Sequence, residues 1–108
     1  MLARKYRLHT AREIRAVFRG GRKIDGKFFT AWLSLRHESS MATVVVSRAV
    51  DKRAVARNLL KRRVREVLRV ILPRLPRGAH VIIRPKPESK NLSLKDIKNT
   101  LCDLFRIS

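Results

Sequence analysis

Apolar residues recur at helical spacing along residues 11–19, and this pattern predicts the first helix of the chain. Thr10 and Glu13 have the spacing of a capping box, in which a hydroxyl and a carboxylate satisfy two otherwise unpaired backbone donors at a helix start. One face of the helix carries the apolar side chains of Ile14, Val17 and Phe18. Gly20 and Gly21 follow directly and predict the end of the helix.

Four further segments have the patterns of β-strands. Residues 22–24 are an edge-strand candidate, and Asp25 and Gly26 form a turn pair typical of hairpins. Residues 42–47 hold three consecutive valines, which predicts a strand buried on both faces, and residues 79–84 form a last strand. The remaining strand, residues 27–35, alternates, with Phe28, Thr30, Trp32 and Ser34 on one face and Phe29, Ala31, Leu33 and Leu35 on the other.

A long amphipathic helix is predicted from Arg53 to about Leu72, because Pro73 cannot continue it. Its apolar face carries Ala56, Leu60, Val64, Val67, Leu68 and Ile71. Its opposite face carries Asn58, Lys61, Arg62, Arg65 and Arg69, with Arg57 on the border. The helix therefore combines a core-facing side with a basic side.

The last helix is predicted to begin after Ser93, which has Asp96 three residues further on. We expect its core-facing residues to be Leu94, Ile97, Leu101 and Leu104. The predicted order is α-β-β-β-α-β-α, an α+β sandwich with one sheet and helices packed mainly on one side. Since no repeat or linker interrupts the pattern, residues 1–108 are predicted to form one domain.

The charge of the chain points to a polyanionic partner. It carries 27 Lys and Arg against 8 Asp and Glu, a formal net charge of +19, while 44% hydrophobic residues suffice for a core. Such self-repulsion opposes folding, so we interpret the charge as a binding surface for a polyanion. The chain shows no signal segment and no membrane span, which predicts a cytoplasmic protein. The single Cys102 excludes an internal disulfide and a multi-cysteine zinc site.

Residues 52–77 concentrate the positive charge, with ten Lys and Arg and only one acid, Glu66. A solvated helix face is the alternative interpretation, but such faces usually interleave acids that form pairs four residues apart. The basic side of the helix gains most free energy when phosphates replace its counterions, and this favours nucleic-acid binding. The predicted RNA-binding residues are Lys52, Arg53, Arg57, Asn58, Lys61, Arg62, Arg65 and Arg69.

The sequence offers no local pattern for catalysis by the protein. Its acids are scattered and form no close pair of the kind that holds Mg²⁺ for phosphodiester hydrolysis. His9, His37 and His80 lie far apart in sequence, with no spacing typical of a metal site or an acid–base pair. Phe18 and Trp32 are candidates for stacking on unpaired bases in a shared groove, with ordinary core packing as the alternative.

The basic helix resembles the signature helix of the bacterial ribonuclease P protein subunit. Arg57, Asn58, Lys61, Arg62 and Arg65 match that signature, whereas Leu59 stands where the family usually has Arg. The similarity extends to the first helix and to the strand ends, and so covers nearly the whole chain.

The resemblance implies a fold like that of ribosomal protein S5 domain 2, with a left-handed β-α-β crossover. It also implies a catalytic RNA that holds Mg²⁺ and cleaves precursor tRNA, while the protein grips the single-stranded 5′ leader in a groove. Phe18 and Trp32 match aromatic groove positions, and Ile14 replaces a third aromatic. No catalytic residue, protein-bound cofactor, membrane or obligate protein partner is then expected.

Two other classes of function stay open at this point. A basic ribosomal or nucleoid-associated architectural protein would have a similar composition, although ribosomal proteins often carry extended basic tails. The second class is a stand-alone endonuclease, and cleavage activity in RNA-free protein would be the evidence for it.

Overall fold

The structure, a computed structural model of the chain, describes residues 4–8 and 10–107. In this part of the chain, three helices accompany one sheet: α1 (Ala11–Gly20), α2 (Ala54–Ile71) and α3 (Leu94–Leu104). The strands are β1 (Arg22–Asp25), β2 (Phe29–Ser34), β3 (Met41–Val44) and β4 (His80–Pro85). Short 3-10 turns occur at η1 (Arg4–Tyr6), η2 (Leu72–Arg74) and η3 (Pro87–Ser89). The predicted element order is confirmed.

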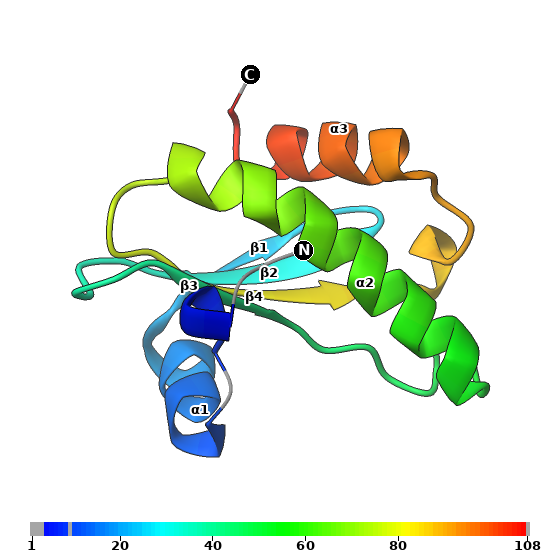
Figure 1. Cartoon of the computed structure of the whole chain (residues 1–108), viewed down its shortest axis with the longest axis horizontal. Coiled ribbons are helices and arrows are strands. Elements are labelled where there is room, and N and C mark those ends of the chain that lie inside the picture. Colours follow the sequence, from blue (N-terminus) through cyan, green and yellow to red (C-terminus); the bar gives the residue numbers. More distant parts are fainter. Residues whose placement is uncertain (1–3, 9, 108) are drawn as a thin grey trace.

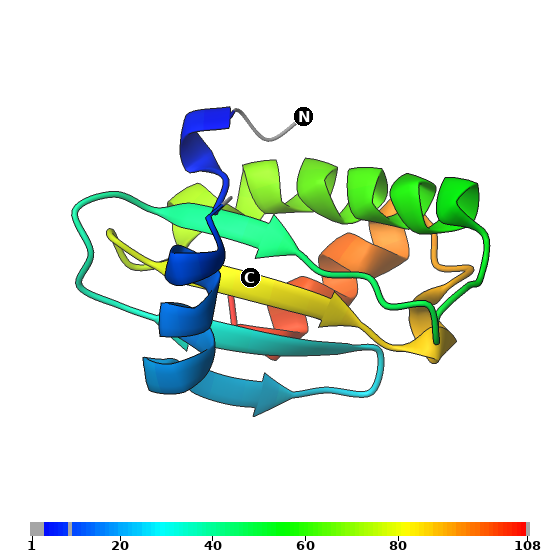
Figure 2. The same ribbon diagram turned by 90° about the horizontal axis from the view of Figure 1, so that it is seen from below.

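The four strands form a sheet in the order β1-β2-β4-β3. β2 pairs antiparallel with β1 and with β4, whereas β3 runs parallel to β4 at the edge. In Figure 2, β3 and β4 both run to the right, α2 lies behind them and β4 lies below β3, which makes the crossover left-handed. Crossovers of this kind are overwhelmingly right-handed. The handedness implied by the family resemblance is therefore confirmed.

The helices cover both faces of the sheet. α2 and α3 lie on one face and α1 crosses the other (Figures 1 and 2). The larger core lies under α2 and α3, and its fully buried side chains include Phe29, Leu68, Ile71, Ile83 and Leu101. A smaller cluster of Leu8, Val17 and Ile82 lies under α1, with Ile14 and Trp32 partly buried against it. The face under α1 is thus the more open one.

The predicted capping box of α1 is present. Glu13 N donates to Thr10 Oγ1 at 3.1 Å, and Thr10 N donates in return to Glu13 Oε1 at 3.3 Å. α2 begins one residue after the predicted start and passes into η2 at Leu72. The hairpin predicted at Asp25 and Gly26 joins β1 to β2.

Two predictions of burial are wrong. β3 ends at Val44, and it alternates between buried and half-buried residues because it is an edge strand whose second face the N-terminal segment before α1 covers only in part. Leu94 is 48% exposed, since the first turn of α3 extends past the buried cluster that holds Ile97 and Leu101. No helix among the described residues combines the length and apolar character needed to cross a bilayer.

Candidate nucleic-acid interface

The start of the basic helix is fixed by Asp51, a residue that the sequence patterns did not single out. Its side chain is only 6% exposed and accepts hydrogen bonds from Arg53 N at 2.9 Å and from Arg53 Nη2 at 3.0 Å. Lys90 Nζ, from the segment before α3, lies 2.9 Å from Asp51 Oδ2. The bonds from Arg53 and then Lys90 hold the pKa of Asp51 far below its usual value. The ionised carboxylate therefore ties two loops together beneath α2.

Arg57 also supports this loop. Its Nη1 donates to the carbonyl oxygens of Asp51, at 3.0 Å, and of Lys52, at 2.8 Å. A guanidinium has five N–H donors in total, so Arg57 retains donors beyond those at Nη1. This predicted RNA-binding residue consequently has a structural role as well.

The expectation that the basic side of α2 is unpaired is wrong for Arg69. Arg69 Nη2 lies 2.9 Å from Glu66 Oε1, because residues three apart on a helix are neighbours. Arg53 pairs with Asp51, as described above. The other predicted residues divide by burial: Lys52, Asn58 and Arg62 are exposed, and Lys61 and Arg65 are half-buried.

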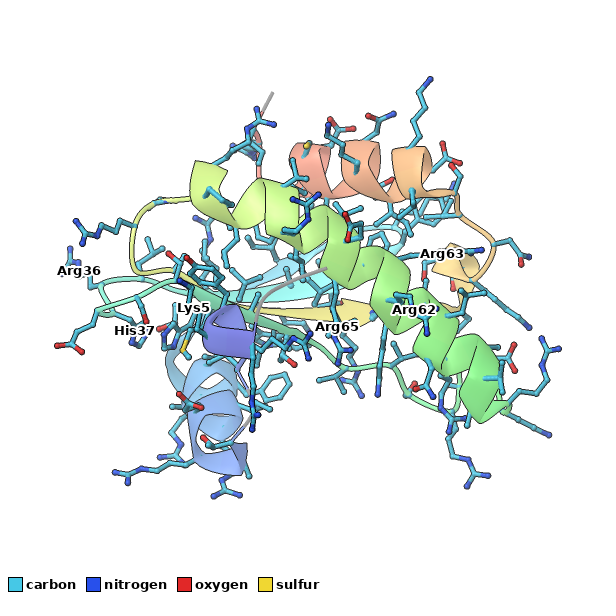
Figure 3. The ribbon with its side chains drawn as sticks, in the orientation of Figure 1. Lys5, Arg36, His37, Arg62, Arg63 and Arg65 are labelled. Carbon is cyan, nitrogen blue, oxygen red and sulfur yellow. The ribbon has the colours of Figure 1, made fainter. Side chains whose placement is uncertain are left out.

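Arg65 and Arg63 project to different sides of α2. Figure 3 shows Arg65 on the side of η1 and α1, and Arg63 on the side of η3. Leu59 is 44% exposed, so the departure from the family signature places an apolar side chain at the surface. It lines a cavity of about 200 Å³ together with Arg53, Arg63 and Lys90, among others.

A larger groove of about 390 Å³ lies at the β3 edge, between α1 and α2. Ile14 lines it from α1, Lys61 and Arg65 from α2, and Arg7 from the N-terminal segment. Burial, and then the positive charge of Arg7, lower the pKa of Arg65. The floor of the groove is aliphatic and consists of β3 and the residues that follow it. Cations border this floor, and a bound anion would relieve their mutual repulsion.

The predicted groove residues do not all meet in this groove. Phe18 and Trp32 contact each other edge to face beside it, with ring centres 4.8 Å apart. The strand register places Trp32, Ile82 and Thr43 in one row across β2, β4 and β3. Since neighbouring strands lie about 4.8 Å apart, Trp32 is two strands, or roughly 10 Å, from Thr43 in the groove wall. The predicted residues thus lie along one continuous surface on the α1 side of the sheet, with Ile14 in the groove and with Phe18 and Trp32 nearer β2.

Arg84 is a further cation on this face. It pairs in register with Thr30 on β2 and lies two residues beyond Ile82, so its exposed side chain shares the α1 side of the sheet. The signal that could have identified it was an Arg at the end of the apolar run Val81, Ile82 and Ile83 in the predicted strand. Arg7, outside every predicted element, gave no such signal.

Two of the three histidines meet in space, a contact that their spacing in the sequence does not indicate. The rings of His37 and His80 stack with centres 3.7 Å apart and planes 5° apart. The contact arises because Ser34 and His80 are register partners and the backbone N–H of His37 donates to the carbonyl of Gly78. Burial, and then His37, lower the pKa of His80. His9 lies outside the described residues.

The described residues contain no group of three His, Cys, Asp or Glu side chains arranged to hold a metal ion. What they assemble is a basic helix, a cationic groove and an aromatic pair on the open sheet face. These are features suited to binding a nucleic acid.

Comparison with known proteins defines the class. The sequence profile of the family described as Ribonuclease P matches residues 2–107. The fold is that of bacterial RNase P proteins: the structure of the Thermotoga maritima protein superposes with a TM-score of 0.80 at 25% identity, covering 94% of this chain and 97% of that one. A Staphylococcus aureus RNase P protein mutant with defective mRNA degradation activity gives 0.83 at 19% identity, covering 94% and 86%.

Sequence relatives agree with the fold. The ribonuclease P protein component of Petrotoga mobilis is 34% identical over 95% of this chain and 91% of its own length. That of Exiguobacterium is 32% identical over 97% and 91%. The chain belongs to the bacterial ribonuclease P protein family, and is thus a protein subunit of a tRNA-processing enzyme.

Proposed function

We propose that this chain is the cytoplasmic protein partner of a catalytic RNA that removes the 5′ leader from precursor tRNA. In this proposal α2 binds the catalytic RNA, and the face from the groove to Trp32 binds the single-stranded leader. The observation that carries it is the groove itself, where Arg7, Lys61 and Arg65 border an aliphatic floor beside an accessible aromatic pair.

The basic side of α2 suits a phosphate backbone. Asn58 and Arg62 are exposed there and Lys52 is exposed just before the helix, and in the described part of the chain no acid forms an ion pair with Lys52 or Arg62. Each phosphate contact by Lys or Arg releases counterions, so the affinity falls steeply with salt. Arg57 and Arg53, although engaged with the loop, keep the helix start in place for these contacts.

The groove and its neighbours suit a single strand. Proteins that bind single strands combine a positively charged channel for the backbone with aromatic rings on which bases stack. Arg65, Lys61 and Arg84 supply charge at this face, and Phe18 and Trp32 supply the rings. Ile14 provides an aliphatic wall and no stacking ring, so stacking is confined to the end of the face near β2.

In this proposal the Mg²⁺ ions and the cleavage step belong to the RNA. The residues of the chain bind and orient the two RNA molecules. They also lower the electrostatic cost of bringing two polyanions together, which is greatest when Mg²⁺ is scarce.

Reconstitution with the catalytic RNA tests the proposal. RNA-free protein should restore cleavage of precursor tRNA at low Mg²⁺, and an Arg62→Gln, Arg65→Gln variant should require more protein for the same rate. The matched control is Lys95→Gln, Lys98→Gln on α3, which removes the same charge from exposed positions. If both variants reduced the restored cleavage equally, the proposed role of α2 would be overturned.

Two outcomes would support the other classes instead. Equal binding to any RNA or duplex DNA, with no effect on cleavage, would indicate an architectural protein. Cleavage by the protein without RNA would indicate a nuclease.

A further inference from the structure

The outer side of α1 carries a second basic stripe, formed by Arg12, Arg15 and Arg19. At 100° per residue these three side chains fall within a sector of about 60°. All three are exposed, whereas Val17 on the inner side is buried against the sheet. The stripe therefore points away from the core.

Among residues 4–8 and 10–107, no acid forms an ion pair with this stripe. The only acid in α1 is Glu13, whose Oε1 accepts hydrogen bonds from Thr10 N and Thr10 Oγ1 in the capping box. None of the three arginines forms an ion pair with a residue that the structure describes. Arg12 also lies in the first turn, where the helix dipole disfavours a cation. No ion pair among the described residues therefore explains the charge of this stripe.

The distribution of charge among the helices is uneven. α3 has two lysines and two aspartates, and its formal charges cancel. α1 has three arginines and one glutamate, and α2 is strongly basic. α1 and α2 lie on opposite faces of the sheet (Figure 2), so the phosphates of one RNA segment lying along α2 do not neutralise the arginines on the outer side of α1.

Resting on the function proposed above, we propose that the outer side of α1 binds the phosphate backbone of a second, double-helical RNA segment, so that the protein bridges two RNA segments. Arginine suits this partner because its guanidinium binds phosphate oxygens in a bidentate manner. The small side chains of Ala11 and Ala16 border the arginines, and the one aromatic ring of α1, Phe18, lies about 60° further round the helix from Arg15, where it packs against Trp32. A membrane surface is disfavoured because the apolar side of α1 is already packed on the sheet.

An RNA hairpin with a fully paired stem and a minimal loop is the probe. The variant Arg12→Gln, Arg15→Gln, Arg19→Gln keeps the capping box and the buried face of α1. We expect its hairpin affinity to fall, and the slope of log affinity against log salt to shrink by about 0.9 for each phosphate that the variant no longer neutralises. The control variant, Lys95→Gln, Lys98→Gln, Arg106→Gln, removes three exposed cations elsewhere and should leave the slope unchanged.

A charge-preserving variant, Arg12→Lys, Arg15→Lys, Arg19→Lys, should retain the salt slope, and circular dichroism should show all variants folded. A native gel with catalytic RNA and labelled hairpin together should show a ternary complex that the glutamine variant does not form. An unchanged hairpin affinity in that variant, or competition between the two RNAs, would overturn the inference.

The two proposals fail separately. In one outcome, the α1 variant loses hairpin binding, and the Arg62→Gln, Arg65→Gln variant still binds the catalytic RNA normally. This outcome would support the second site and contradict the assigned role of α2. Loss only from the α2 variant would leave that role intact and remove the second site.

Discussion

The ring of Phe18 in α1 meets the indole of Trp32 in β2 edge to face, with ring centres 4.8 Å apart and planes inclined by 81°. Phe18 remains 38% exposed, and Lys23 Nζ lies 5.8 Å from the centre of the Trp32 ring. The pair therefore joins the helix to the sheet and still presents aromatic surface and a cation to a ligand.

Trp32 should report the binding of a leader. It is the only tryptophan of the chain, and stacking of a base on this aromatic pair is worth roughly 1–3 kcal/mol. Precursor tRNA should change its fluorescence, and Phe18→Ala should weaken the leader-dependent part of the binding. Mature tRNA, which lacks the leader, is the control. Equal responses to the two RNAs would return Trp32 to a packing role.

Arg62→Ala should weaken RNA binding and leave the fold unchanged. Its side chain is exposed and forms no ion pair with a described residue, so the free energy of unfolding should change by at most about 0.5 kcal/mol. The salt slope of RNA affinity should shrink by about one phosphate. Thermal melts and titrations at several salt concentrations measure both. Severe destabilisation with unchanged affinity would contradict the surface role.

Asp51→Asn should lower the melting temperature, because it removes the charge that binds Arg53 and Lys90. The pKa of Asp51 is lower in the folded chain than in the unfolded chain, so its contribution is complete above the unfolded value of about 4. It is lost as the pH falls toward the folded pKa. Melting curves should therefore differ most at neutral pH and converge in acid. Asp103→Asn, at an exposed position, should show no such difference.

The His37–His80 stack should make the free energy of unfolding depend on pH at mildly acidic pH, above the range in which Asp51 acts. The pKa of His80 is lowered by burial and by His37, so protonation favours the unfolded chain. The stabilisation is complete above the unfolded value of about 6.5 and is lost as the pH falls below it. His80→Gln should flatten this part of the stability profile. An unchanged slope between about pH 7 and pH 5 in that variant would exclude the stack as its source.

Folding should respond to multivalent anions. A net charge of +19 opposes compaction, and Arg65 and Arg7 are held close enough to repel each other. An anion that binds only the folded state stabilises it by about 2.7 kcal/mol at a hundredfold excess over its Kd. Sulfate should therefore raise the melting temperature more than chloride at equal ionic strength. Identical melts in the two salts would show that screening alone governs the charge.

Local patterns determined the elements of this protein. The capping box at Thr10 and Glu13, the glycines that follow α1 and the amphipathic pattern of α2 each concern residues within one or two helical turns, so the elements could be read with small errors at their ends. The basic side of α2 and its resemblance to the ribonuclease P signature were equally local. Those features sufficed to identify the family.

Tertiary structure decided the rest. The partners Asp51 and Lys90, Arg7 and Arg65, and His37 and His80 are 39, 58 and 43 residues apart, and no periodicity relates them. They meet because β4 pairs antiparallel with β2 and parallel with β3, and because Arg7 bridges to Ala42 of β3, so that the sheet brings distant segments side by side. The sequence therefore determined which residues carry charge and on which side of a helix they lie, and the packing of the sheet determined which charges meet.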